Sequence, residues 1–322
     1  MTLMRVLVTG GAGFIGSSFA KKAKQQGWDV TIFDNLSTGH KSTVDELEKL
    51  GIRVIIGDIR DRDLLSKETA NCTAVVHLAA QVSVPLSVEK PEETNEINVQ
   101  GTDNVIQSCF DNDVQRLVVA SSAAVYGNAD NLPLKEQDAG QTLSPYAESK
   151  WINEQQILDA RNNGLNATAL RFFNVYGVGQ RPDGAYAAVV PKFVDMMVNK
   201  QAPRINGDGL HTRDFVHVDD VCNAIWSLID GEWKAQNHHV YNVATQTKVT
   251  LLDLIAIINN TLTSEDADFT PLIPTHGPER VGDIRHSMAS IARISETIQW
   301  SAMVAFEQGI KELVLQRLNS KS

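Results

Sequence analysis

The sequence predicts an α/β fold with a doubly wound parallel sheet, because short apolar strands alternate with longer amphipathic helices through its first half. The expected strands are rich in β-branched residues and run continuously apolar, which is typical of strands buried on both faces. In chain order they read RVLVTG, DVTIFD, RVIIGD, AVVHLAA, RLVVASS and ATALRFF. Amphipathic stretches at 17–26 and 98–110 are expected to cover this sheet as helices.

The texture of the sequence changes after Phe173, where it becomes irregular and contains Gly and Pro. A late apolar run, HHVYNVAT, is expected to rejoin the sheet. The remaining segments would form a smaller domain over the strand ends, where open α/β sheets bind ligands. We therefore expect one domain at 4–171, rejoined by about 214–246, and a smaller substrate-binding domain made of 172–213 and 247–322.

Composition limits the partners that the protein can have. The chain is 43% hydrophobic and 21% charged, as in soluble globular proteins, and its formal net charge of -10 argues against nucleic acid or an anionic membrane as a partner. A small anion held by local arginines stays compatible with this charge. No run reaches the ~18 apolar residues of a membrane span, and the glycine-broken start does not read as a signal peptide. Cys72, Cys109 and Cys222 have no disulfide or metal spacing, so we expect a cytoplasmic protein.

The segment RVLVTGGAGFIGSSF predicts a strand, a glycine turn and a helix. Gly11, Gly13 and Gly16 satisfy G-x-G-x-x-G, and Gly10, Gly13 and Gly16 satisfy G-x-x-G-x-x-G. Such glycines let the backbone approach a pyrophosphate at the free N–H groups of a helix N-terminus. The second strand ends at Asp34, where an acid accepts hydrogen bonds from ribose hydroxyls and repels a 2′-phosphate. This pattern indicates a Rossmann-type domain that binds NAD rather than NADP, unless Asp34 only begins the turn DNLSTG.

The stretch SPYAESK predicts a helix with two chemically linked side chains in its first turns. Ser144 is a good N-cap and Pro145 suits the first helical position, which places Tyr146 and Lys150 one turn apart on one face. A neighbouring ammonium lowers the pKa of a phenol from its usual value of about 10. Ser122 closes the strand RLVVASS and could supply a hydroxyl at the same sheet edge. The alternative is an ordinary surface helix.

Other polar clusters have plainer interpretations. Asp58, in GDIRD, is a candidate for the adenine side of the cofactor site, although a turn-capping role is almost as good. The acids of 214–220 are expected to cap a helix beginning near Val221, so no metal site is expected. His238 and His239 lie beside a strand without nearby acids or cysteines and are expected to face solvent.

Five motifs in order, TGGAGFIG, SSAAVYG, YAESK, RFFNVYG and RDFVHVDD, resemble those of the extended short-chain dehydrogenases/reductases. The chain is most similar to the NAD-dependent nucleotide-sugar 4-epimerases of UDP-glucose and UDP-N-acetylglucosamine, over essentially its whole length. The resemblance implies that Tyr146 removes the proton of the sugar 4-hydroxyl. Lys150 would bind the nicotinamide ribose and lower the pKa of Tyr146, and Ser122 would hydrogen-bond the sugar oxygen. The 4-ketose formed by hydride transfer to NAD would turn in the site and receive the hydride on its opposite face.

The resemblance also implies binding residues. For the cofactor these are Gly10, Gly13, Phe14, Ile15, Gly16, Asp34, Asn35, Asp58, Ile59, Ala79, Ala80, Gln81, Tyr146, Lys150 and Phe173. For a UDP-sugar they are Ser122, Tyr146, the diphosphate contacts Asn174, Arg213 and Arg280, the uracil contact Val190, the ribose ligand Asp283, and Ser287. Ser287 would lie beside the sugar 2-substituent, where a small residue leaves space for an N-acetyl group. Alternatively, the arginines are solvated, Val190 is core and Ser287 ends a turn.

Rival functions differ at a few positions. Nucleotide-sugar 4,6-dehydratases and UDP-glucuronate decarboxylases usually carry an acid shortly after the strand-five hydroxyl, where this chain has Ala123 and Ala124. Elimination is therefore disfavoured, whereas UDP-glucuronate 4-epimerisation stays open. A non-catalytic NAD-binding sensor would not need Ser122, Tyr146 and Lys150. The resemblance further implies a homodimer formed through helices such as 98–110 and 146–161.

Overall fold

A computed structural model describes residues 4–129, 131–183, 188–232, 237–279 and 284–320. Its centre is a seven-stranded sheet in the order β11-β6-β5-β4-β1-β2-β3, in which every neighbouring pair is parallel. The strands are β1 (Arg5–Thr9), β2 (Asp29–Asp34), β3 (Arg53–Ile56), β4 (Ala74–His77), β5 (Arg116–Ser122), β6 (Ala167–Phe172) and β11 (Val240–Val243). The predicted doubly wound Rossmann-type sheet is confirmed.

The register of the sheet brings the carboxyl ends of its central strands to one edge. Thr9 of β1 pairs with Phe33 of β2 on one side and with His77 of β4 on the other. The strand order reverses between β1 and β4, and open α/β sheets bind ligands at such a switch point. The segments that follow these strands therefore define the place where a ligand site is expected.

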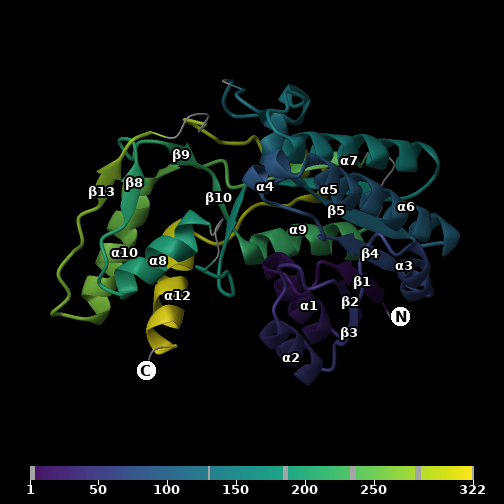
Figure 1. The fold of residues 1–322 in the computed structure, drawn as a ribbon, viewed down its shortest axis with the longest axis horizontal. Helices are drawn as coiled ribbons and strands as arrows, with labels where there is room; N and C mark the ends of the chain where they lie inside the picture. Colours follow the sequence, from purple (N-terminus) through teal and green to yellow (C-terminus); the bar gives the residue numbers. More distant parts are fainter. Residues whose placement is uncertain (1–3, 130, 184–187, 233–236, 280–283, 321–322) are drawn as a thin grey trace.

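Helices cover both faces of the sheet (Figure 1). One hydrophobic core contains side chains of α1 (Phe14–Gln25) and α9 (Val218–Asp230), and a second contains side chains of α3 (Arg62–Thr69), α6 (Gly101–Asp111) and α7 (Pro145–Asn162). The smaller helices are α2 (Lys41–Lys49), α4 (Val84–Glu89) and α5 (Pro91–Asn95), with 3₁₀ turns at Ala123–Tyr126 and Glu136–Asp138. This two-faced burial explains why the strand sequences are continuously apolar.

The segment 98–110 was expected to form one regular helix, but it begins within a π-helical turn. A π-helical turn, Glu96–Gln100, precedes α6, and within it Asn98 is 1% exposed. Short π-helical segments occur frequently at functional sites because they turn a side chain out of the regular helical register. Here the inward-facing residue is polar.

The C-terminal elements lie beside the sheet and have a core of their own (Figure 1). It is formed mainly by α8 (Val189–Val198), α10 (Leu251–Glu265) and α12 (Phe306–Asn319). Three short two-stranded sheets belong to this part of the chain. They are β7 (Asn174–Tyr176) with β10 (Phe215–His217), β9 (Thr212–Arg213) with β12 (Val249–Thr250), and β8 (Arg204–Asn206) with β13 (Thr275–Gly277). Helix α11 (Ala292–Ile298) follows β13 in the chain. The expected return of HHVYNVAT to the sheet is confirmed, because β11 pairs with β6.

The sequence suggested that the acids of 214–220 cap a helix beginning near Val221, and this prediction is wrong. Helix α9 already begins at Val218, and its N-cap is His217. Asp214 accepts hydrogen bonds from the backbone N–H groups of Thr245, Gln246 and Ala289. Asp220 likewise accepts from the N–H groups of Met303 and Val304, at 2.9 and 3.1 Å. These carboxylates therefore fasten distant loops to one another.

Within the described ranges, no helix is long and apolar enough to cross a bilayer. Nor do the side chains placed in the structure include a group of three or more His, Cys, Asp and Glu arranged to hold a metal ion.

Candidate functional site

The glycine turn after β1 packs too closely for a side chain at Gly10, Gly11 and Gly16. Gly10 has φ +68°, and a Cβ there would lie 2.6 Å from the backbone N of Ala79. A Cβ on Gly16 would collide with the backbone of Gly10 and Gly11. The turn is closed by a 3.1 Å hydrogen bond from Gly13 N–H to Gly10 C=O, and α1 begins at the next residue, Phe14. The first N–H groups of α1 are thus preceded by backbone without side chains, which a pyrophosphate can approach closely.

Asp34 ends β2 beside this turn and is 8% exposed. Its Oδ2 accepts a 2.9 Å hydrogen bond from Ala12 N–H, and its Oδ1 accepts a 2.8 Å bond from Leu36 N–H. The carboxylate therefore braces both the glycine turn and the start of the DNLSTG turn. The two sequence interpretations of Asp34 are compatible, because it begins that turn and also faces the cofactor turn.

Asp58 and Asn35 lie together on the neighbouring strand ends. Asn35 Nδ2 donates to Asp58 Oδ2 at 2.9 Å, and Arg60 donates to Asp58 through its backbone N–H and its guanidinium. The Arg60 guanidinium holds the pKa of Asp58 well below its usual range. Asp58 therefore stays ionised and does form the local turn contact expected of a capping residue. The next residue, Ile59, is buried at 5% exposure.

The segment after β4 carries Ala79, Ala80 and Gln81, which are all half-buried. The side chain of Asn98 holds this segment, because Gln81 N–H donates to Asn98 Oδ1 at 2.8 Å and Asn98 Nδ2 donates to Gln81 C=O at 2.9 Å. Phe173, at the end of β6, is 5% exposed. All of these predicted cofactor residues follow strands of the same sheet.

Ser122, Tyr146 and Lys150 come together as predicted. The side chain of Ser122, at the end of β5, interacts with the phenol of Tyr146, in the first turn of α7, and favours the ionised form of that phenol. Ser144 caps α7 by accepting a 3.1 Å hydrogen bond from Ala147 N–H, as its sequence position indicated. Lys150 is 4% exposed, and its ammonium donates to the carbonyl of Ala120 at 3.0 Å. Helix α7 thus presents both side chains to the end of β5.

The electrostatics of this cluster differ from the expectation in one respect. Burial raises the pKa of the Tyr146 phenol, and the hydrogen bond with Ser122 only partly opposes that rise. The expected lowering of this pKa by Lys150 is not found, and the ammonium of Lys150 donates to the Ala120 carbonyl. Burial lowers the pKa of Lys150 to about 8, against an opposing contribution from Glu154. Lys150 is therefore still mostly protonated at neutral pH.

Several buried residues that support the cluster were missed by the sequence reading. Arg171 and Glu154 form a bidentate ion pair, and Glu154 also accepts a 2.5 Å hydrogen bond from the hydroxyl of Ser121. The signal for them was weak: a charged residue inside the apolar run ATALRFF, and an acid four residues after Lys150. Neither position belongs to a recognisable catalytic pattern.

A second chain of buried polar groups runs from the glycine turn to α6. Thr102 donates its hydroxyl hydrogen to Asn98 C=O at 2.6 Å, so His77 Nε2–H must donate to the Thr102 oxygen at 2.9 Å. His77 Nδ1 then accepts from the Thr9 hydroxyl at 2.7 Å. These partners fix a neutral histidine, and burial lowers its pKa to about 3, with a smaller contribution from Lys150.

Three predicted substrate residues are gathered by backbone pairing. Asn174 N–H donates to Asp214 C=O at 3.0 Å, which places β7 beside the residue after Arg213. Ser287 N–H donates to Thr212 C=O at 3.1 Å on the other side of Arg213. Asn174 is exposed, Arg213 is half-buried and Ser287 is 8% exposed. Segments far apart in sequence therefore bring these three predicted residues close together.

Val190, the predicted uracil contact, is a buried core residue. Its side chain is 1% exposed and belongs to the C-terminal hydrophobic core with Phe193 and Val194. The alternative interpretation of Val190 as a core residue describes its side chain, so a uracil contact at this position would have to use the backbone. Arg280 and Asp283 lie outside the described residues.

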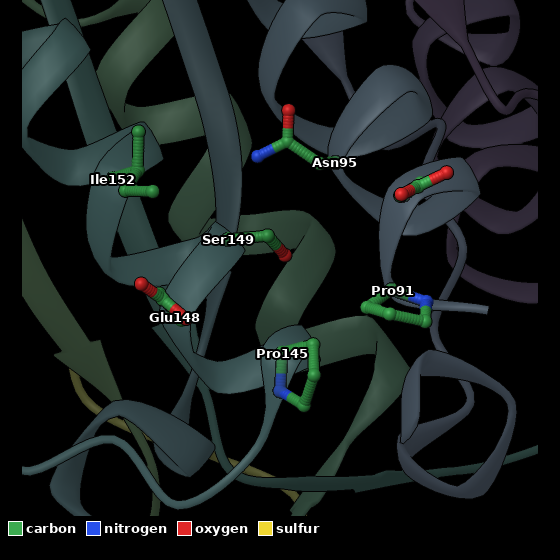
Figure 2. A pocket seen from close by; sticks show the side chains of 7 residues that line it. Pro91, Asn95, Pro145, Glu148, Ser149 and Ile152 are labelled. Carbon is green, nitrogen blue, oxygen red and sulfur yellow. The ribbon is translucent and has the colours of Figure 1, made fainter. Parts of the chain in front are cut away.

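A pocket of about 280 Å³ lies on the outer side of the first turns of α7 (Figure 2). Asn95 and Pro91 of α5 face Pro145, Glu148, Ser149 and Ile152 of α7 across it, and Glu92 completes the lining. Neither Ser122 nor Tyr146 lines this pocket, so the catalytic cluster and the pocket lie on different sides of the helix.

Comparison with known proteins places this geometry in a family. Residues 6–244 match the model of the NAD-dependent epimerase/dehydratase family. A putative UDP-glucose 4-epimerase of Methanocaldococcus jannaschii is 36% identical over 312 residues, which are 96% of this chain and 97% of that protein. A UDP-N-acetyl-alpha-D-glucosaminuronate decarboxylase of Bacillus cytotoxicus is 31% identical, with 96% of each chain covered.

A solved structure agrees over the full length. The UDP-N-acetylglucosamine 4-epimerase of Methanobrevibacter ruminantium, in complex with UDP-N-acetylmuramic acid, has a TM-score of 0.91 at 34% identity, with 100% of both chains covered. NAD as the cofactor is confirmed at the level of the family description. The resemblance drawn from the five motifs is likewise confirmed: this chain belongs to the NAD-dependent epimerase/dehydratase family, among the extended short-chain dehydrogenases/reductases.

Proposed function

We propose that this chain is a UDP-hexose 4-epimerase that interconverts UDP-GlcNAc with UDP-GalNAc, and UDP-glucose with UDP-galactose. The observation that carries the proposal is the arrangement at the end of β5, where the Ser122 side chain interacts with the Tyr146 phenol and Lys150 is buried one turn further along α7, with its ammonium on the carbonyl of Ala120. It lies at the sheet edge that also carries the glycine turn and Asp34. Relatives described as UDP-glucose and UDP-N-acetylglucosamine 4-epimerases support the same reaction class.

The cofactor cradle fits NAD. The turn from Gly10 to Gly16 has no room for a Cβ at either end, which leaves bare N–H groups for a pyrophosphate. The Asp34 carboxylate lies beside this turn, where it can accept hydrogen bonds from ribose hydroxyls and would repel a 2′-phosphate. When bound, NAD supplies the acceptor and donor of hydride for sugar carbon 4, and a positive ring beside the phenol.

The residues of the cluster then have separate tasks. Tyr146 takes the proton of the sugar 4-hydroxyl and later returns it, while Ser122 holds the same oxygen by a hydrogen bond. Because burial raises the pKa of Tyr146, the base needs positive charge nearby to give up its proton at neutral pH. The nicotinamide ring would supply this charge when NAD is bound, and Lys150, protonated at this pH and one turn along the helix, would hold the nicotinamide ribose.

The positions after Ser122 favour epimerisation over elimination. Ala123 and Ala124 form the 3₁₀ turn that follows β5, and neither can donate or accept a proton. Dehydratases usually place an acid there to expel water. A site without that acid keeps every atom of the sugar and changes only the configuration at carbon 4.

The test is an incubation of the purified protein with UDP-GlcNAc, UDP-glucose and UDP-glucuronate, without added NAD, followed by proton NMR of the anomeric signals. Both 4-epimer pairs of the hexoses should appear. Tyr146→Phe should lower turnover by about 10²-fold or more while UDP-sugar binding persists. Conversion of UDP-glucuronate alone would replace the proposed substrate, and release of water or carbon dioxide would refute epimerisation.

A further inference from the structure

The backbone N–H of Tyr146 needs a partner from outside its own helix. The first N–H groups of an α-helix have no intrahelical acceptor. In α7, Ser144 is the N-cap, Pro145 has no N–H, and Ala147 donates to the Ser144 hydroxyl. Tyr146 lies between them, and its N–H donates to the Oγ of Ser87 at 3.1 Å.

Ser87 has its hydrogen-bonding roles fixed by its surroundings. The residue is 0% exposed and lies in α4, and its hydroxyl hydrogen is donated to Val84 C=O at 2.7 Å. The oxygen lone pairs are left as acceptors, and the Tyr146 N–H can only donate. A single hydroxyl therefore ties α4 to the residue that carries the phenol.

The carbonyl group of Tyr146, in the next peptide unit, is also held. The Ser149 hydroxyl donates to Tyr146 C=O at 2.8 Å and accepts from Asn98 Nδ2 at 2.9 Å. Asn98 in turn holds the backbone of Gln81. The main chain of Tyr146 is thus braced from α4 on one side and from the cofactor segment on the other.

We propose that Ser87 is a positioning residue for the reaction: by accepting the N–H of Tyr146 it sets the distance of the phenol from Ser122 and from the sugar oxygen. The inference rests on the proposed function, which makes Tyr146 the base. Proton transfer requires hydrogen-bond distance, and a misplacement of about 1 Å can cost about 10²-fold in rate. Ser87 touches neither the phenol nor Ser122 through its side chain, so its effect is exerted through the backbone alone.

The test compares two serines of α4. Ser87→Ala removes the acceptor of Tyr146 N–H and should lower kcat by about 10-fold or more, with the Kd for UDP unchanged. Ser83→Ala is the matched control, because Ser83 is the N-cap of the same helix and accepts from Leu86 N–H at 3.2 Å. It should lower the Tm as Ser87→Ala does but leave kcat within twofold. Ser87→Thr, which keeps the hydroxyl, should recover most of the lost rate.

A direct measurement of the ionisation of the Tyr146 phenol tests this inference separately from the proposed function. Ultraviolet difference titration of the NAD-loaded protein, with Tyr146→Phe as the blank, measures the ionisation of Tyr146 without turnover. Ser87→Ala should move that ionisation to higher pH, as the contact with Ser122 loosens, and Ser83→Ala should not. A titration and kcat unchanged by Ser87→Ala, or equal losses in both variants, would overturn the positioning role. A wild type that converts no UDP-sugar would instead refute the proposed function.

Discussion

The carboxylate of Glu154 and the guanidinium of Arg171 form two hydrogen bonds, of 2.7 and 2.6 Å, in a place where their side chains are 0% and 1% exposed. The pair joins α7 to β6. Ser121, next to Ser122, donates to the same carboxylate. The helix that carries Tyr146 and Lys150 is therefore fixed to the sheet edge by a buried charge pair.

This ion pair gives a prediction about stability. Glu154→Gln leaves the Arg171 charge buried without its partner, and breaking such a pair typically costs about 3–5 kcal/mol in the free energy of unfolding. Urea unfolding would measure the loss, and Arg171→Leu should cost a similar amount. The double variant should lose much less than the sum, because no charge is then left unpaired. Asp45→Asn, which removes a surface pair with Lys41, is the control and should change little. A loss in Glu154→Gln no larger than in that control would contradict the prediction.

Asp34 should decide the choice between NAD and NADP. The wild type is expected to bind NAD more tightly, because the carboxylate repels a 2′-phosphate. Asp34→Asn keeps an acceptor for Ala12 N–H while removing the charge, so it should narrow the preference for NAD. Asp29→Asn, at the other end of β2, should leave the preference unchanged. Calorimetric titration with NAD and with NADP measures the preference. Equal affinities of the wild type for the two cofactors would exclude a role of Asp34 in choosing between them.

His77 should make the protein sensitive to acid. Its folded pKa of about 3 is below the ordinary value of 6.5, so the unfolded chain binds more protons between these pH values. Stability should therefore fall as the pH falls from 6.5 towards 3. His77→Gln should reduce the slope of Tm against pH in this window, whereas the exposed His238 should have little influence when replaced in the same way. An identical slope in His77→Gln would show that other groups govern acid unfolding.

Ser287 gives the prediction on sugar selectivity. It is 8% exposed and lies beside Arg213 through its hydrogen bond to Thr212. Ser287→Tyr adds a ring where little space is left, and overpacking typically costs about 1–3 kcal/mol. The variant should suppress turnover of UDP-GlcNAc far more than that of UDP-glucose, with both rates measured at saturating substrate. Ser287→Ala is the control for loss of the hydroxyl. Equal loss on the two substrates, or no wild-type activity on UDP-GlcNAc, would show that this position is not the gate.

The features of the fold and of the site that depend on residues close together in the sequence could be predicted from local sequence patterns. The glycine turn, Asp34 and the cap at Ser144 each follow from a requirement of the backbone within a few positions. The parallel arrangement of the strands also followed, because continuous apolar runs that alternate with helices are typical of a parallel sheet covered on both faces.

Contacts between distant segments could not be read in this way. Ser87 binds Tyr146, and Asn98 binds Ser149, across spans for which a single sequence holds no periodic signal. The π-helical turn that points Asn98 inward has no distinctive residue pattern. The rise in the pKa of Tyr146 could not be read from the sequence either, because helical spacing places Lys150 near the phenol but does not show that the phenol is buried.

The seventh strand constrains the order in which a growing chain can fold on the ribosome. β6 is synthesised well before β11, so its outer edge has no partner until residue 243 has left the exit tunnel. An unpaired edge of apolar sequence is a template for aggregation. Asn242 of β11 also binds Tyr126, whose hydroxyl accepts from Arg171, so the buried charge pair is enclosed only at that late moment. A nascent chain stalled before β11 is therefore the form that most needs a chaperone.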